Sequence, residues 1–259
     1  MTYQRFIVLG DSFTEGMTDE IINGNFRGWA DRVADVLTTQ SPDFTYVNLA
    51  IRGKLIAQVA GDQVPQAIPF ITGKETLVSF HAGINNVIRP NYRPENVFPI
   101  YNDAVRKLSA TGATLMLFTV LEQTGNTGKT ADMWAERFGA FNKNVRAIAV
   151  EVGAIIVDAN GQQFLSDRRF LAFDRLHLNS IGHDRVAQGV LEVLGAPFDP
   201  NWRLPLPTAK PTPWLVKKAT SVAWFFSFAL PWIWRRVRGK SSGDGRSAKY
   251  PTPTSWPLS

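Results

Sequence analysis

Short apolar runs alternate with amphipathic stretches along the first 195 residues of the chain. Five of the runs are rich in β-branched and aromatic residues, as buried strands are, and they cover residues 6–9, 44–49, 76–81, 114–120 and 154–158. Between them, apolar positions recur three and four residues apart, as on the buried face of a helix. Alternating strands and helices predict an α/β fold in which helices cover both faces of a mostly parallel sheet.

The apolar spacing predicts where several of these helices lie. One helical face is formed by Trp29, Val33, Val36 and Leu37, and another by Trp134, Phe138, Phe141, Val145 and Ile148. A further helix is expected over residues 102–108, ending before Gly112. The last should cover residues 181–194, with Ser180 as its N-cap and Gly195 as its stop. We therefore place a single domain at residues 1–196.

The character of the chain changes after this domain. Six prolines between residues 197 and 213 indicate an extended, Pro-rich linker over residues 197–216. An apolar and basic amphipathic segment follows at residues 217–238, and residues 239–259 are rich in Gly, Ser and Pro, which favours disorder. A spanning helix needs about 20 apolar residues, so the 16 at 219–234, with Pro231 among them, favour an interfacial helix over a transmembrane one. Peripheral membrane contact, docking on the domain itself and self-association through residues 217–238 all remain open.

Charge and composition narrow the class of protein. Residues 201–259 carry ten Lys and Arg against one acid, whereas the first 200 residues carry 18 bases and 21 acids. The net charge of +6 therefore describes the tail, and we expect no nucleic-acid partner for the domain. The chain has no cysteine, which excludes disulfides and a cysteine nucleophile. Its start lacks the pattern of a secretory signal, so we expect a cytoplasmic protein, with a peripheral position at the inner membrane face as the alternative.

Candidate catalytic residues follow two of the predicted strands. Ser12 comes just after the first apolar run, in Gly10-Asp11-Ser12, and Asp174 precedes His177 by three positions. A serine hydroxyl needs a base to take its proton and a third group to orient that base. An aspartate and a histidine three positions apart share one side of a helical turn, so Asp174 is expected to hold the imidazole while its other nitrogen faces Ser12.

Four short blocks in this order resemble the SGNH, or GDSL, hydrolase family over about residues 3–195. They are Gly10-Asp11-Ser12-Phe13-Thr14-Glu15-Gly16, Asn48-Leu49-Ala50-Ile51-Arg52-Gly53, Gly83-Ile84-Asn85-Asn86 and Asp174-Arg175-Leu176-His177. The resemblance implies a three-layer αβα sandwich with a flavodoxin-like five-stranded parallel sheet. It also implies a serine esterase or lipase that uses no cofactor.

The same resemblance implies a role for each matching residue. Ser12 is the nucleophile, His177 the general base and Asp174 its orienting partner. The oxyanion hole is formed by Ser12, Gly53 and Asn85. The physical chemistry agrees, because a glycine permits close backbone approach and an asparagine amide is a donor that does not titrate. Few histidines and no cysteine argue against a catalytic metal.

One position departs from the family pattern. Asn86 stands where the third block usually has an aspartate, which we take as a structural support rather than a reacting group. The leading hypothesis is a serine hydrolase that cleaves acyl or acetyl esters of a small molecule, lipid or sugar. The alternative is a catalytically weak binding or scaffolding protein of the same fold. His81 and His183 are interpreted as structural. The sequence does not define the acyl chain length, the alcohol portion or the oligomeric state.

Overall fold

Six strands form the central sheet of this protein, in the order β7-β6-β5-β1-β4-β8. The computed structural model describes residues 2–122, 127–161 and 163–257. The strands are β1 (Arg5–Gly10), β4 (Thr45–Asn48), β5 (Thr76–His81), β6 (Thr114–Phe118), β7 (Ile155–Val157) and β8 (Tyr250–Ser255). A separate two-stranded hairpin consists of β2 (Ile21–Ile22) and β3 (Asn25–Phe26).

Five of the six strands are parallel, as the apolar runs predicted. β1 lies at the centre and pairs with β4 on one side and β5 on the other, and β6 and β7 follow outward from β5. Numbered along the chain, these five strands have the order 2-1-3-4-5 of flavodoxin-like folds. In such sheets, binding and chemistry gather beyond the carboxyl ends of the strands, where the order of the strands reverses.

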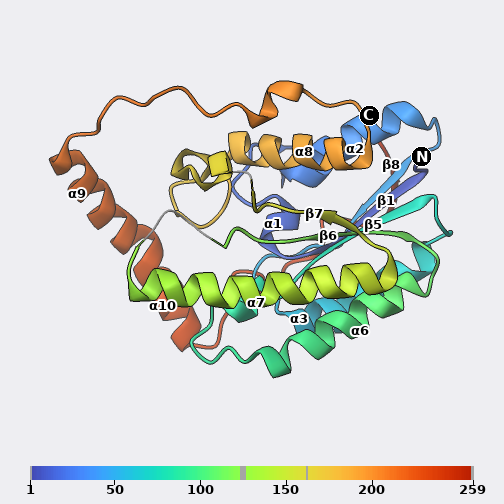
Figure 1. Cartoon of the computed structure of the whole chain (residues 1–259), viewed down its shortest axis with the longest axis horizontal. Helices are drawn as coiled ribbons and strands as arrows, with labels where there is room; N and C mark the ends of the chain where they lie inside the picture. Colours follow the sequence, from blue (N-terminus) through green and yellow to red (C-terminus); the bar gives the residue numbers. More distant parts are fainter. Residues whose placement is uncertain (1, 123–126, 162, 258–259) are drawn as a thin grey trace.

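Helices cover both faces of the sheet, so the protein has three layers (Figure 1). α2 (Gly28–Leu37) and α8 (Ser180–Leu194) pack against each other on one face. The other face carries α3 (Ile56–Gln58), α4 (Val64–Ala67), α6 (Phe98–Ser109) and α7 (Lys129–Val152). Two short helices, α1 (Ser12–Glu15) and α5 (Ile84–Val87), follow β1 and β5 directly. The expected αβα sandwich is therefore confirmed.

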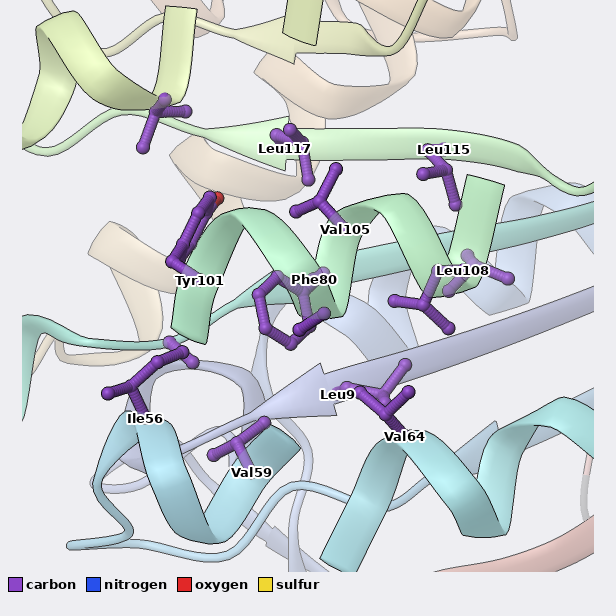
Figure 2. Packing of buried hydrophobic residues seen from close by; sticks show 14 of the residues in the cluster. Leu9, Ile56, Val59, Val64, Phe80, Tyr101, Val105, Leu108, Leu115 and Leu117 are labelled. Carbon is purple, nitrogen blue, oxygen red and sulfur yellow. The ribbon is translucent and has the colours of Figure 1, made fainter. Parts of the chain in front are cut away.

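Each face of the sheet has its own hydrophobic core, because successive side chains of a strand point in opposite directions. In β1, Phe6 and Val8 pack toward α2 and α8, whereas Ile7 and Leu9 pack toward α6 and α7. Figure 2 shows the second of these cores, in which Phe80 of β5 lies near Tyr101 and Val105 of α6. A sheet buried on both faces explains why its strands are continuous apolar runs rather than alternating ones.

The ends of the helices differ from the sequence prediction by a few residues. α8 begins at Ser180, but its N-cap is Asn179, whose side chain accepts the N–H of Gly182. Ser180 was the expected cap, and Asn179 takes the role because its oxygen reaches the free N–H groups of the first turn. Gly195 ends the helix in the left-handed conformation, as predicted.

The C-terminal extension is more structured than its composition indicated. After a 3₁₀ turn at Pro200–Arg203, the chain runs to α9 (Trp214–Trp224), a π-helical turn at Phe225–Ala229 and α10 (Leu230–Val237). No helix among the described residues is both long and apolar enough to cross a membrane.

The prediction of disorder over residues 239–259 is wrong for the part that forms a strand. β8 pairs antiparallel with β4 and becomes the sixth strand, at the edge of the sheet. An edge strand tolerates Pro251 and Pro253, because a proline there need not donate a ladder hydrogen bond. Residues 258 and 259 lie outside the described residues.

Candidate active site

Ser12 lies at the first residue of α1, directly beyond the carboxyl end of β1. Asp11 is the N-cap of this short helix, and its carboxylate accepts the N–H of Phe13 at 3.3 Å. The turn is sharp because Gly10 has no side chain. A Cβ at Gly10 would collide with the backbone carbonyl of His81. The side chain of Gln63 bonds both the N–H and the C=O of Gly10, at 2.8 and 2.9 Å, which fixes the strand end.

Ser12, His177 and Asp174 form one hydrogen-bonded chain. The Ser12 Oγ lies 3.0 Å from His177 Nε2, and His177 Nδ1 lies 2.6 Å from Asp174 Oδ2. Ser12 and His177 are 165 positions apart in the sequence. The structure thus brings together the three side chains that the sequence singled out, and in the order required for a nucleophile, its base and an orienting acid.

The segment that carries Asp174 and His177 is a loop, so the expected helical turn is wrong. Arg175 has a φ of 61°, the left-handed region, and a residue in that conformation interrupts an α-helix. The two side chains still meet because the Asp174 carboxylate folds back on its own loop. Its Oδ1 accepts the N–H groups of Leu176 and His177, each at 3.0 Å. Aspartate commonly closes turns in this way.

The local environment keeps Asp174 ionised. Burial alone would raise the pKa of Asp174, but the hydrogen bond and charge of His177, together with the backbone donors of Leu176 and His177, outweigh burial and lower it. A carboxylate that stays charged can fix the tautomer of His177 with a proton on Nδ1. That leaves Nε2 free to accept the proton of Ser12.

Gly53 and Ser12 both offer backbone N–H groups next to this chain of residues. Among the described residues neither N–H donates to a protein acceptor. Gly53 has a φ of 75°, which favours glycine, and it follows Arg52. Arg52 is held in place by Glu15, whose carboxylate accepts the backbone N–H of Arg52 at 2.6 Å and pairs with its guanidinium. The ion pair ties the Gly53 loop to α1, and sequence reasoning had not assigned it this role.

Asn85 is close to Ser12 but its amide is already engaged. Its Nδ2 donates to Asp11 Oδ2 at 2.9 Å and to the backbone carbonyl of Lys54 at 3.1 Å. Burial raises the pKa of Asp11, which accepts one of these two bonds, to about 6. For Asn85 to reach an oxyanion, one of these two bonds must be exchanged.

Asn86 fills the supporting role expected of the aspartate it replaces. Its side-chain oxygen accepts the N–H of Ile56 at 2.9 Å, at the start of α3. An amide oxygen accepts this bond as a carboxylate oxygen would. Asn86 therefore links the third block to the start of α3.

Two hollows share Ser12 and His177 in their walls. The larger, of about 360 Å³, extends from Ser12 between the ends of the strands and α8, and most of its lining is apolar, including Phe118, Leu165 and Val186. Its size is typical of sites for small organic ligands. The smaller, of about 40 Å³, holds Ser12, His177, Gly53 and Asn85 at its wall. Phe228, Trp232, Arg235 and Ser242 of the C-terminal extension close its other side.

The other two histidines are buried near the larger hollow. Burial lowers the pKa of His81 and of His183 to about 4, so both are neutral at ordinary pH. His81 packs against Phe13, and His183 Nε2 lies 3.1 Å from the carbonyl of Met17. No cluster of three or more His, Asp or Glu suited to a metal ion occurs in the described ranges.

The C-terminal extension contacts the domain at this site. Docking on the domain was one of the alternatives left open by the sequence, but its location beside Ser12 was not predicted. Trp224 Nε1 donates to the backbone carbonyl of Asp174 at 2.9 Å. A Cβ at Gly53 would collide with the hydroxyl of Ser241, so Ser241 lies directly on the Gly53 loop. The apolar, tryptophan-rich composition of residues 219–234 was the only sequence signal for such docking.

The comparisons with known proteins agree with the fold and the blocks. The profile of the family described as GDSL-like Lipase/Acylhydrolase matches residues 8–185. No curated protein matches the chain.

Solved structures of similar fold include several esterases. LAE5, an α/β hydrolase enzyme from the metagenome of Lake Arreo in Spain, is 20% identical with a TM-score of 0.60, covering 74% of this chain and 95% of its own. Axe2, an acetylxylan esterase from Geobacillus stearothermophilus, is 19% identical with a TM-score of 0.61, covering 77% and 95%. The psychrotrophic esterase EstA from Pseudoalteromonas sp. is 14% identical with a TM-score of 0.58, covering 74% and 97%. These likenesses establish a shared fold.

Proposed function

The chain belongs to the GDSL-like lipase/acylhydrolase family and is an ester-hydrolysing enzyme, and from this premise we propose that it cleaves carboxylic acyl or acetyl esters through an acyl-enzyme on Ser12. The observation that carries the proposal is the continuous chain from Ser12 Oγ to His177 at 3.0 Å and from His177 to Asp174 at 2.6 Å. In this order the three side chains can act as the nucleophile, the base and the orienting acid of acyl transfer.

In the proposed acylation step, Ser12 Oγ attacks the carbonyl carbon of the ester while His177 Nε2 takes the hydroxyl proton. The carbonyl oxygen becomes an oxyanion. When the tetrahedral intermediate collapses, the bond to the alcohol oxygen breaks and His177 gives its proton to that oxygen. Water then attacks the acyl-enzyme, and His177 takes its proton and returns one to Ser12 Oγ. Atoms and charge balance, and the products are the alcohol and the carboxylic acid.

The free N–H groups of Ser12 and Gly53 support an oxyanion hole beside the nucleophile. Fixed donors at the position of the developing charge contribute about 3–4 kcal/mol each to transition-state stabilisation. Asn85 is the proposed third donor. Since its amide bonds Asp11 and the Lys54 carbonyl without substrate, it joins the hole only by giving up one of them.

The test is loss of the hydroxyl in Ser12→Ala. We expect turnover of p-nitrophenyl acetate to fall by about 10⁴-fold or more, because nucleophile and base act as a unit. Ser109→Ala is the matched control and should keep its activity. Ser109 ends α6 just before the amino end of β6, whereas the site lies beyond the carboxyl ends of the strands. A folded Ser12→Ala protein with undiminished activity would remove the proposal.

Covalent labelling separates this proposal from its alternative. A fluorophosphonate should label Ser12 in the unaltered protein and fail to label His177→Ala, which lacks the base. Absence of labelling in the unaltered, folded protein would favour the catalytically weak binding or scaffolding role instead.

The proposed partners are a small-molecule, lipid or sugar ester as substrate and a peripheral contact made by the C-terminal extension. The extension lies beyond the part of the chain matched by the family, which ends at residue 185.

A further inference from the structure

The C-terminal helical rod, which we define as residues 214–237, stands beside the three-layer domain (Figure 1). It consists of α9, the π-helical turn at Phe225–Ala229 and α10 in unbroken succession. The π turn lies just before Pro231, a residue that lacks the N–H required inside an α-helix. The rod therefore continues past a residue that would ordinarily end it.

One face of the rod is docked on the catalytic mouth. Trp224 bonds the Asp174 carbonyl at 2.9 Å, and the guanidinium of Arg175 lies 4.8 Å from the centre of the Trp224 ring. Phe228 and Trp232 line the small hollow that contains Ser12. Positions 224, 228 and 232 are four residues apart, so this inner face is a single stripe along the rod.

The opposite face of the rod is a second apolar stripe with no covering partner. It consists of Val222, Phe226, Leu230, Ile233 and Val237, which are spaced by four, four, three and four residues, and their exposed fractions are 50%, 63%, 45%, 46% and 75%. Phe225 and Trp234 flank the stripe and are also exposed. A contiguous exposed apolar surface of this kind usually marks a site of interaction with a protein or a membrane.

Positive charge lies at both ends of the exposed stripe. Lys217 and Lys218 precede it, Arg235 lies in its last turn beside the small hollow, and Arg238 follows it. None of these four forms an ion pair with a carboxylate among the described residues. Residues 200–243 contain eight Lys and Arg and no Asp or Glu. The surface therefore complements a partner that is apolar and negatively charged.

We propose that the outer stripe of the rod docks in the plane of an anionic lipid surface. Aromatic side chains enter the headgroup boundary of such a surface, and basic side chains bind its phosphates. A second copy fits less well. Paired in either direction, two rods would bring their lysine and arginine ends together without a carboxylate between them, which is unfavourable.

The docked rod would lie between the lipid surface and the small hollow that contains Ser12. The mouth of the hollow would then face the lipid across the rod. That this mouth is catalytic rests on the proposed function, but the membrane contact itself does not. Ser12→Ala should bind vesicles as the unaltered protein does. Loss of esterase activity and loss of membrane contact are therefore separate results.

The experiment is co-sedimentation of the full chain with phosphatidylcholine vesicles that contain or lack phosphatidylglycerol. We expect binding to the anionic vesicles, weakened by added salt. Phe226→Ser with Ile233→Ser should lower the partition coefficient by roughly tenfold or more per side chain. Lys217→Gln with Lys218→Gln should lower it by about fivefold per charge. Val150→Ser is the matched control, because Val150 is 81% exposed on α7 and outside the rod.

Three results would overturn the proposal. The first is failure of the unaltered protein to sediment with anionic vesicles. The second is undiminished binding of the Phe226 and Ile233 double variant while circular dichroism shows it folded. The third is a concentration-dependent dimer in ultracentrifugation that the double variant abolishes, without any vesicle binding. That last result would assign the stripe to a second copy of the chain.

Discussion

Lys249 is the residue whose loss should most clearly destabilise the C-terminal extension. It lies just before β8, and its ammonium group bonds Asp31 of α2 at 2.7 Å. It also donates to the backbone carbonyls of Phe26 at 2.7 Å and Arg27 at 3.0 Å. The side chains of Lys249 and Asp31 are each only 4% exposed. Lys249→Met keeps most of the length of the unbranched side chain and removes the charged ammonium group.

The expected cost follows from what the substitution leaves behind. Asp31 would remain buried with one side-chain donor, the Tyr46 hydroxyl at 2.9 Å. Removing one member of a buried ion pair costs about 3–5 kcal/mol, since the other charge stays uncompensated. For a chain of this size, that free energy lowers the melting temperature by roughly 6–20 °C.

The cost should depend on pH, because Asp31 can escape it by taking a proton. Burial raises the pKa of Asp31 to about 6 even with Lys249 beside it, and without the ammonium charge it rises further. An unfolded aspartate has a pKa of about 3.9. The folded variant therefore binds a proton that the unfolded chain releases, and its stability falls as pH rises through this window. We expect a small deficit near pH 4 to 5 and the full deficit near pH 8.

Urea unfolding at the two pH values measures this deficit. Lys240→Met removes an exposed lysine of the same extension and is the control. Asp31→Asn combined with Lys249→Met should recover part of the loss at about pH 8, because no buried charge then remains unpaired. A loss under about 1 kcal/mol for Lys249→Met at that pH, or a loss equal at both pH values, would refute the reasoning.

Three further predictions concern the site. Asp174→Asn should lower kcat by about 10³–10⁴-fold with little change in KM in p-nitrophenyl acetate assays, because an amide favours the wrong tautomer of His177; a loss under tenfold would exclude an orienting role. Gly53→Ala should lower kcat at least tenfold, and adding Ser241→Gly should recover only the part caused by collision with the serine, not the part caused by positive φ. Val186→Trp should narrow the larger hollow and selectively impair hydrolysis of long acyl esters, tested with a panel from acetate to palmitate; equal losses on all chain lengths would place the acyl group elsewhere.

The parallel sheet and the three side chains of the proposed triad were predictable because their signals are local. A strand buried on both faces is a short apolar run, and each block follows the end of such a run. The pairing of Asp174 with His177 was predictable, but the loop conformation that brings them together was not. Spacing by three suited a helix, and nothing in the sequence marked Arg175 as the residue with positive φ.

β8 was not predictable for a different reason. Its sequence, Tyr-Pro-Thr-Pro-Thr-Ser, has two prolines that ordinarily exclude a strand. Only its position decides otherwise: β8 has a single neighbour, β4, and it pairs there through Tyr250, Thr254 and Ser255 rather than through the prolines. Position at an edge is a tertiary property, which composition does not carry.

The extension is part of the site rather than an appendage to it. A Cβ at Gly243 would collide with the Arg52 carbonyl, just as a Cβ at Gly53 would collide with Ser241. The two segments approach this closely because Gly243 and Gly53 have no Cβ at the points of contact. The strap at residues 241–243 is thus pressed onto the loop that offers the Gly53 N–H, and the Lys249–Asp31 pair fixes the chain just beyond it. Since Glu15 holds the other side of Arg52, the orientation of this N–H depends on both ends of the sequence.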